Sequence, residues 1–332
     1  MILTLVALAL NPQTNTVRFI GRFTHENGGM ACEWPGSAVQ FATNSNSATV
    51  RLKASTDGDR WQVDVDGRQT EILKLNPKVE EYTVHLPDKN SHLVTLVRRT
   101  ETFTGKTTWL GTKDAASQGP LVLRRKILII GDSISAGYGV DGAKKEEHYS
   151  VETSNAYMTY GWVAARLTHA DPTIVAWSGR KMYPDNTMPE IFDYVLPNEK
   201  QGTAADDPKT QAVLINLATN DFGKAIPDKT KWTGAYQAFV SKLRSKFPKA
   251  HIYLATGCMM SDNWPPNIKA LTTLNGYLDS IKKSLRDPKV HQIDFAIQDE
   301  KDGIGSDWHP NAKTQMKMGL RFAEALKKDL GW

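Results

Sequence analysis

The sequence predicts an α/β protein in two parts, an antiparallel β-sandwich of the jelly-roll type followed by a parallel sheet between layers of helices. The chain has 332 residues, which is more than one hydrophobic core usually serves. Short alternating segments fill its first third, and buried apolar runs alternate with amphipathic stretches in the rest. A stretch of small residues separates the two patterns. We therefore expect a sandwich over residues 1–113, a linker over 114–121 and a three-layer α/β/α domain over 122–332.

The composition narrows the class of protein. Hydrophobic residues at 40% and charged residues at 23% are ordinary for a folded globular chain, and they exclude collagen-like and disordered proteins. Basic residues exceed acidic ones only by 41 to 36, which makes a weak case for binding nucleic acid. No apolar run approaches the ~20 residues that span a bilayer. We expect neither nucleic acid nor a membrane as a partner.

Two features remain open at this level. Met1–Leu10 is apolar and contains Ala7-Leu8-Ala9, which fits the cleavage site of a secretory signal, but it lacks a basic start. It is either an incomplete or truncated signal or a first strand. Cys32 and Cys258 are too few for a metal site of their own, and whether they form a disulfide cannot be decided from spacing.

The first part of the chain is predicted to consist of strands. Alternation of apolar and polar residues is plain in Val50-Arg51-Leu52-Lys53, and Asp66-Gly67 is a hairpin signal. No helical period occurs there. The expected strands are Val17–Phe23, Ala48–Ala54, Trp61–Val65, Glu71–Leu75, Tyr82–Leu86 and Leu93–Arg98.

The second part changes to apolar runs and helices. Apolar residues at helical spacing predict helices around Tyr236–Phe247 and, after Pro310, around Met316–Leu330. Buried strands that alternate with helices indicate a parallel sheet covered on both faces. The expected strands are Ile127–Ile130, Ile174–Trp177, Val213–Leu217, Ile252–Ala255 and Val290–Phe295.

Polar residues follow three of these apolar runs directly. Ligands of such sheets bind beyond the carboxyl ends of the strands, so chemistry is expected there. A fourth polar segment precedes the last predicted helix. The four segments are Gly131-Asp132-Ser133-Ile134-Ser135, Ser178-Gly179-Arg180, Ala218-Thr219-Asn220-Asp221 and Gly305-Ser306-Asp307-Trp308-His309-Pro310.

These residue types suit acyl transfer. A serine hydroxyl needs a base within hydrogen-bond reach, and imidazole is the side chain that titrates near neutrality, which pairs Ser133 with His309. The oxyanion that forms needs donors in place, which the amides of Ser133 and Gly179 and the side chain of Asn220 supply. Each motif alone also fits a turn or a helix cap. Their conjunction, in this order, favours catalysis.

The four segments resemble the blocks of the SGNH (GDSL-like) hydrolases, in which Ser133 corresponds to the nucleophile, Gly179 and Asn220 to oxyanion donors and His309 to the base. Together with Trp34-Pro35-Gly36-Ser37 in the sandwich, they resemble the two-domain acetyl esterases of carbohydrate esterase family 2 over nearly the whole chain. The resemblance implies an acetylxylan-esterase-like carboxylic ester hydrolase that deacetylates plant polysaccharides such as xylan or glucomannan.

The third catalytic residue is an open question. Most SGNH enzymes have Asp three residues before the His, where this chain has Ser306, and Asp307 stands two residues before. In an extended segment Asp307 and His309 point to the same side, which allows a triad, but the alignment with Nδ1 is poor. The resemblance to family 2 favours a Ser-His dyad whose His is oriented by a backbone carbonyl, with Asp307 serving the sugar site.

Aromatic residues beside the blocks are candidates for holding the sugar. Trp308 and Tyr183 flank the base and the oxyanion segment, whereas Trp34 is expected to pack structurally. No cofactor or metal is expected, since the other histidines form no metal-binding pattern. A polymeric substrate implies secretion, and we expect a monomer. The alternatives are a catalytically silent carbohydrate-binding protein, or an SGNH esterase for lipid or peptidoglycan acyl esters.

Overall fold

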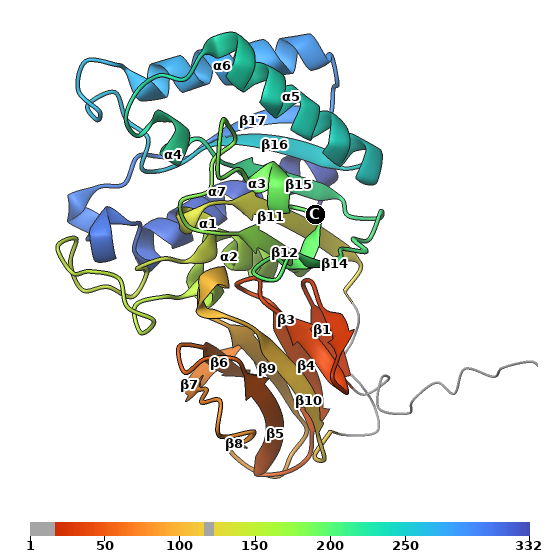
Figure 1. Ribbon diagram of the computed structural model, residues 1–332. Helices are drawn as coiled ribbons and strands as arrows, with labels where there is room; N and C mark the ends of the chain where they lie inside the picture. Colours follow the sequence, from red (N-terminus) through yellow and green to blue (C-terminus); the bar gives the residue numbers. More distant parts are fainter. Residues whose placement is uncertain (1–16, 116–122) are drawn as a thin grey trace, which may run out of the picture.

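The computed structural model describes residues 17–115 and 123–332. The segment Met1–Leu10 and most of the predicted linker lie outside the described residues, so both predictions stay predictions. The last strand of the sandwich ends at Thr112, and the parallel sheet begins at Arg125. Figure 1 shows the sandwich below the parallel sheet and its helices.

Two antiparallel five-stranded sheets form the sandwich, which confirms the predicted class. Their strand orders are β1-β4-β9-β6-β7 and β2-β3-β10-β5-β8. Phe41, Trp61 and Trp109 are among the buried residues between the sheets. The strands are β1 (Val17–Ile20), β2 (Thr24–Glu26), β3 (Gly29–Cys32), β4 (Ala38–Thr43), β5 (Ser47–Ala54), β6 (Arg60–Val65), β7 (Arg68–Lys74), β8 (Glu81–His85), β9 (His92–Arg98) and β10 (Thr107–Thr112).

Several details of the sandwich differ from the sequence prediction. The first strand ends at Ile20, because Gly21 with a φ of 97° turns the chain. Four strands, β2, β3, β4 and β10, were not predicted, since glycines, threonines and small residues obscure their alternation. The predicted hairpin at Asp66-Gly67 is confirmed. Both residues have positive φ, 54° and 82°, as a type I′ turn requires.

A parallel five-stranded sheet forms the centre of the second part, as predicted. Its order is β12-β11-β15-β16-β17. Alternate residues of the strands face opposite sides: Leu128 and Ile130 pack in the cluster that contains α5 and α6, and Ile127 and Ile129 in the cluster that contains α2 and α7. The strands are β11 (Arg125–Gly131), β12 (Ala170–Ala176), β15 (Ala212–Asn216), β16 (His251–Thr256) and β17 (Val290–Asp294).

Helices cover both faces of this sheet (Figure 1). The four long ones are α2 (Tyr160–Thr168), α5 (Lys229–Lys246), α6 (Ala270–Leu285) and α7 (Ala312–Leu330). The predicted stretch Met316–Leu330 lies within α7, and α5 covers the other one except Phe247, which caps it. The short elements are α1 (Ser133–Ala136), α3 (Met188–Ile191), α4 (Thr219–Phe222), the hairpin β13 (Tyr194–Leu196) and β14 (Gln201–Thr203), and the 3-10 helices η2 (Thr102–Thr104), η3 (Ala156–Met158), η4 (Glu300–Asp302) and η5 (Ser306–Trp308).

The sandwich packs tightly against the α/β part. Trp34, which was expected to have a structural role, is fully buried in the same hydrophobic cluster as Phe192, and its Nε1 donates to the carbonyl of Tyr194 at 2.9 Å. Arg22 pairs with Asp206 across the junction, with Nε 2.9 Å from Oδ1. A buried apolar anchor and buried polar contacts together tie the two parts into one body.

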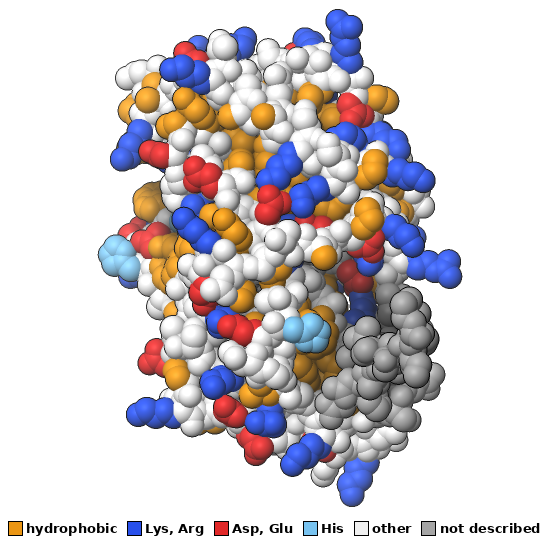
Figure 2. Space-filling view, turned by 45° about the vertical axis from the view of Figure 1, so that its right-hand side comes forward, with side chains coloured by type: hydrophobic (Ala, Val, Ile, Leu, Met, Phe, Trp, Pro, Cys, Tyr) orange, Lys and Arg blue, Asp and Glu red, His pale blue; other side chains and the backbone are white. Residues whose placement is uncertain are grey.

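Two further predictions can be compared with the structure. Cys32 and Cys258 are both buried and both free thiols, which answers the question of a disulfide. Among the described residues, no helix combines the length and the apolar character needed to cross a bilayer. On the face shown in Figure 2, basic side chains are interspersed with acidic and uncharged ones.

Candidate active site

The predicted site residues lie at the carboxyl ends of the parallel strands. Along the sheet, β11 lies between β12 and β15, so the order of connection reverses around β11. This reversal point is where open α/β sheets bind ligands. Ser133 follows β11, Gly179 follows β12 and Asn220 follows β15. The helices α1 and α4 begin at this end of the sheet (Figure 1).

Ser133 is the first residue of the short helix α1. Asp132 caps this helix, and its Oδ1 accepts a hydrogen bond from the Ile134 amide at 3.1 Å. The cap turns the chain sharply out of β11 at Ser133. Ser133 is buried, with 6% of its surface exposed. Nε2 of His309 lies 2.9 Å from Oγ of Ser133, within hydrogen-bond distance. The structure thus brings together two residues that are 176 positions apart.

Our sequence analysis assumed an extended segment before His309. The structure shows the 3-10 turn η5 there instead. Asp307 and Trp308 have positive φ, 49° and 66°, a conformation that costs non-glycine residues free energy. The turn aims the Asp307 carbonyl at His309, whose Nδ1 lies 2.9 Å from that oxygen and 3.3 Å from the Ser306 carbonyl oxygen. Carbonyls only accept hydrogen bonds, so Nδ1 carries the proton and Nε2 is free to accept the Ser133 proton.

The Asp307 carboxylate is directed away from His309. It accepts hydrogen bonds from the Tyr138 hydroxyl and the Tyr149 amide, both at 2.8 Å, and Oδ1 lies 2.9 Å from Nδ1 of His148. Burial favours the neutral acid, but these partners outweigh it and lower the pKa of Asp307. Its backbone, and not its carboxylate, therefore contacts the base. This is the arrangement expected of a dyad.

His309 is half-buried beside aromatic rings. Its ring packs on that of Tyr138, with the centroids 4.3 Å apart, and Tyr149 stacks on the other side of Tyr138. Burial lowers the pKa of His309, and the backbone carbonyls at Nδ1 only partly oppose this effect. The imidazole therefore stays neutral at lower pH than a free one, and a neutral imidazole is the form that accepts a proton.

Gly179 occupies the third position of a tight turn. The Arg180 amide donates to the Trp177 carbonyl at 3.2 Å, and the φ of Gly179 is 79°. A positive φ at this position characterises a type II turn and is the reason that glycine fits there. Asn220 Nδ2 donates to the Arg180 carbonyl at 3.0 Å. The two predicted oxyanion donors thus lie on segments that contact each other.

Sequence reasoning missed a residue that joins these two segments. Oδ1 of Asp221 accepts hydrogen bonds from the amides of Met182 and Tyr183 at 3.0 and 2.9 Å and from Nε1 of Trp232 at 2.8 Å. The carboxylate therefore holds the chain after Gly179 against the chain of Asn220. Its position directly after Asn220 was the only signal in the sequence.

The two aromatic candidates differ in their exposure. Tyr183 is half-buried and packs against the core, whereas Trp308 is 51% exposed. The Trp308 ring carries Nζ of Lys145 over one face, 4.2 Å from the centroid. It also lines a pocket of about 700 Å³. The other lining residues are Cys258, Met259, Ser261, Trp264, Ile297, Gln298, Glu300 and Ile304.

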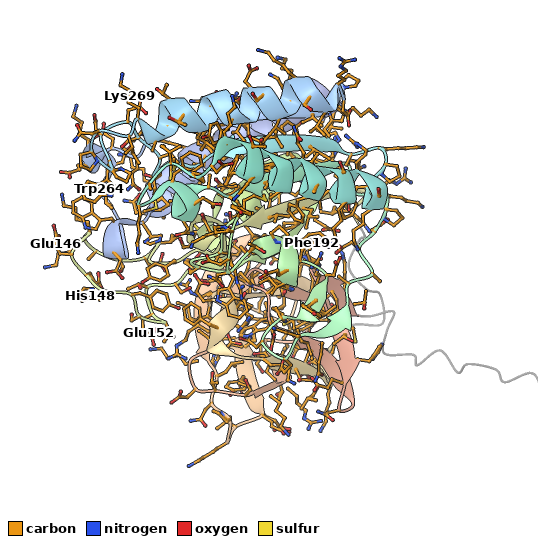
Figure 3. The ribbon with its side chains drawn as sticks, turned by 45° about the horizontal axis from the view of Figure 1, so that its top comes forward. Glu146, His148, Glu152, Phe192, Trp264 and Lys269 are labelled. Atoms are coloured by element: carbon orange, nitrogen blue, oxygen red, sulfur yellow. The ribbon has the colours of Figure 1, made fainter. Side chains whose placement is uncertain are left out.

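This pocket opens between loops on one side of the molecule. Figure 3 shows Trp264, Glu146 and His148 along that side, on the loops that follow β16 and α1. Trp264 is 71% exposed, so two tryptophan rings border the pocket. Aromatic faces of this kind suit the C–H faces of sugar rings.

A different cluster of possible metal ligands lies at the opposite end of the sheet. His251, His291 and Asp329 have ligand atoms within 4.8 Å of one another. Nδ1 of His251 lies 2.9 Å from Nε2 of His291, and the Tyr253 hydroxyl donates to Asp329 at 3.0 Å. These contacts join the two histidines to each other and the carboxylate to Tyr253. Sequence spacing did not reveal the cluster, since β16, β17 and α7 each contribute one residue.

Two family profiles match the chain. The GDSL-like lipase/acylhydrolase family matches residues 129–316, and the N-terminal domain of carbohydrate esterase 2 matches residues 19–121. The first profile contains all the predicted catalytic and oxyanion residues, and the second contains most of the sandwich.

Named relatives agree with these profiles. The chain is 33% identical to the cellulase/esterase CelE of Acetivibrio thermocellus over 95% of its own length, but it spans only 40% of that protein. It is 25% identical to an acetylxylan esterase / glucomannan deacetylase of Cellvibrio japonicus, of which it covers 89%. A solved family two carbohydrate esterase of Clostridium thermocellum, in complex with cellohexaose, has a TM-score of 0.86 and 31% identity, with 95% of this chain and 99% of that one covered.

Proposed function

The chain belongs to the GDSL-like lipase/acylhydrolases and, within them, to carbohydrate esterase family 2, and we propose that it removes acetyl groups from plant cell-wall polysaccharides such as xylan and glucomannan. The contact of 2.9 Å between Nε2 of His309 and Oγ of Ser133 carries this proposal. It places a neutral imidazole, with its proton on Nδ1, next to a hydroxyl at the ligand-binding end of the sheet.

In the first half of the reaction Oγ of Ser133 attacks the acetyl carbonyl carbon, and its proton passes to Nε2 of His309. The carbonyl oxygen becomes an oxyanion, for which the amides of Ser133 and Gly179 and the Asn220 side chain are the donors. The C–O bond to the sugar then breaks, and the sugar oxygen takes the proton from Nε2. An acetyl-enzyme on Ser133 remains.

In the second half a water molecule gives a proton to Nε2 and attacks the acetyl-enzyme through the same oxyanion site. The bond to Oγ breaks, Ser133 recovers the proton, and acetic acid leaves and loses its proton to water as acetate. The Asp307 and Ser306 carbonyls stabilise the imidazolium that exists between the two transfers, in place of a carboxylate. No cofactor or metal enters either half.

The substrate class rests on the surroundings of His309. Trp308 offers a half-exposed aromatic face next to the base, and Tyr183 lies on the segment of Gly179. These rings are proposed to hold the sugar whose acetyl group is attacked. An acetylated polymer as partner further implies that the protein acts outside the cell, and we propose a secreted monomer.

The test is acetate release from acetylated xylan and acetylated glucomannan, with an acylated peptidoglycan and a lipid ester as controls at equal enzyme concentration. We expect release from the plant polymers, and none from Ser133→Ala. Release only from the lipid or peptidoglycan control would reassign the substrate. Binding of the polymers without release of acetate would indicate the alternative, a silent carbohydrate-binding protein.

A further inference from the structure

Glu101 is a carboxylate of the sandwich that reaches the α/β domain. It lies in the loop between β9 and η2 and is fully buried. Its Oε1 accepts a hydrogen bond from the Ser178 hydroxyl, and its Oε2 lies 3.4 Å from the Ser178 amide. Both oxygens therefore contact the residue directly before Gly179. Within the described ranges this carboxylate forms no ion pair.

We infer that Glu101 is a positioning residue that fixes the direction of the Gly179 amide, so that the sandwich takes part in oxyanion stabilisation. The inference rests on the proposed function, since an oxyanion forms only if the site is an esterase. The Gly179 N–H belongs to the central peptide of the turn Trp177–Arg180, between Ser178 and Gly179. Turns of type I and type II differ by a flip of that central peptide, which reverses the direction of the N–H.

Two contacts hold the chain in front of that peptide. Glu101 binds the amide and the hydroxyl of Ser178, and the hydroxyl of Thr102 donates to the Ala176 carbonyl at 2.9 Å. The sandwich loop thus forms hydrogen bonds with both ends of the segment Ala176–Ser178, which leads from β12 into the turn. Fixing Ser178 on its N-terminal side limits the rotation of the peptide that follows it, whereas a glycine at 179, which adopts either sign of φ, would by itself permit both turn types.

A buried ion pair shapes the loop that carries Glu101. Arg98 is fully buried, its Nε lies 3.0 Å from Oδ2 of Asp59, and its Nη2 donates to the Thr104 hydroxyl at 2.9 Å and to the Gly105 carbonyl at 2.6 Å. These bonds fold residues 101–105 back on the end of β9. The direction in which Glu101 points is therefore set inside the sandwich.

A carboxylate at this position does not favour the stability of the folded protein. Burial raises the pKa of Glu101 to about 7, which means that the ionised form costs free energy in the folded protein. A neutral side chain of similar shape would remove that cost. The geometry accounts for an acid here, because one carboxylate can accept from the amide and the hydroxyl of one residue at once.

The experiment measures kcat and KM for 4-nitrophenyl acetate in the full-length wild type and in Glu101→Ala, Glu101→Gln and Ser178→Ala. We expect Glu101→Ala to lower kcat by about 10- to 100-fold, part of the loss caused by removing a donor outright, with KM changed by less than about twofold. Glu101→Gln keeps one acceptor oxygen and should recover most of kcat. Ser178→Ala should lower kcat like Glu101→Ala, and the double variant should lose little more.

Tyr157→Phe is the matched control. The Tyr157 hydroxyl donates to Asp64 in the sandwich, so this variant removes another buried hydrogen bond between the two parts, away from Gly179. It should lower the Tm and leave kcat unchanged. An equal loss of kcat in this control, or a wild-type kcat in Glu101→Ala or Ser178→Ala, overturns the inference. If Glu101→Ala does not fold, Ser178→Ala decides.

The two proposals fail in different ways. A wild type that does not hydrolyse acetyl esters refutes the proposed function and makes the kinetic test moot. A wild type that does hydrolyse them, with Glu101→Ala and Ser178→Ala variants that keep its kcat, refutes only the positioning role. An effect confined to KM would assign Glu101 to substrate binding and would also overturn the inference.

Discussion

The base side and the oxyanion side of the site are held by different means. On the base side, His309 is oriented by carbonyls of its own segment, and the neighbouring Asp307 carboxylate is used elsewhere. On the oxyanion side, the turn of Gly179 is held by Glu101, a carboxylate from another part of the chain. A row of ring contacts leads from the sandwich to the base: Phe103 meets Tyr149 edge-on, Tyr149 stacks on Tyr138, and Tyr138 packs on His309.

This difference shows that nearness in sequence is a poor guide to which carboxylate matters for which group. Asp307 is two residues from His309 and 30% exposed, yet it bonds to other residues. Glu101 is 77 residues from Ser178 and contacts it with both oxygens. The following experiments test how far the two sides can be separated.

The largest effect should come from removing the sandwich. A chain reduced to residues 122–332 would leave the apolar surface around Phe192 without Trp34, and the turn of Gly179 without Glu101. We expect it to aggregate or to lack measurable esterase activity, because exposing a large buried apolar face costs several kcal/mol. Circular dichroism and acetate release check this. A stable fragment with full activity on polymer would contradict it.

Ser133→Ala tests the centre that both sides share. The side chain lies at the start of a short helix, so the fold should survive its loss. We expect kcat to fall by about 10⁴- to 10⁶-fold, the scale for removing a nucleophile. Unchanged thermal unfolding is the control, and His309→Ala should match the loss, because the two residues act as a unit. Activity within tenfold of wild type would rule out Ser133 as the nucleophile.

Asn220→Ala tests the oxyanion side by itself. It removes one neutral donor and leaves Ser133 and His309 in contact, so we expect kcat to fall by about 10²- to 10³-fold. KM for 4-nitrophenyl acetate should change little. Because Asn220 also donates to the Arg180 carbonyl, unchanged thermal unfolding is the control that the turn of Gly179 survives the substitution. An effect confined to KM would point to substrate binding instead.

Asp307→Ala tests the base side. Since the backbone carbonyl and not the carboxylate faces Nδ1, we expect kcat for 4-nitrophenyl acetate to fall by less than about tenfold, whereas a true triad acid costs about 10⁴-fold. With an acetylated sugar the KM should rise, because the carboxylate holds the Tyr138–Tyr149 segment beside Trp308. Comparing both substrates with one variant separates the cases. A large, equal loss on both would restore Asp307 to a triad.

The sequence predicted those parts of the site that follow buried strands. Ser133, Gly179 and Asn220 each come directly after an apolar run, and parallel strands end at one edge of a sheet, so their neighbourhood could be inferred. The fold class could also be inferred, because the hydrophobic pattern changes from alternation in the first part to apolar runs and helical spacing in the second. Their catalytic roles stay predictions until the variants are measured.

The sequence could not show what tertiary contacts decide. The direction of the Asp307 carboxylate depends on two consecutive residues in the left-handed conformation, Asp307 and Trp308, and their local sequence does not predict this conformation. Glu101 is an ordinary charged residue in a loop until the sandwich docks and buries it. The strands β2, β3, β4 and β10 of the sandwich were missed because glycines, threonines and small residues obscure their alternation.

The smallest expected effect concerns pH, and it distinguishes the two sides once more. Burial lowers the pKa of His309 below 6.5, whereas burial raises the pKa of Glu101 to about 7. Falling pH protonates the base and stops proton transfer from Ser133, so kcat/KM for 4-nitrophenyl acetate should decline only below pH 6.5 if His309 sets the acid limb. If the ionised Glu101 were required, the decline would already occur near pH 7. We expect kcat/KM to decline only below pH 6.5 in the wild type. The decline should occur at the same pH in Glu101→Gln, because a neutral acceptor can still bind Ser178. A decline of kcat/KM near pH 7 that is absent in Glu101→Gln would show that protonation of Glu101, on the oxyanion side, and not of His309 causes the loss of activity.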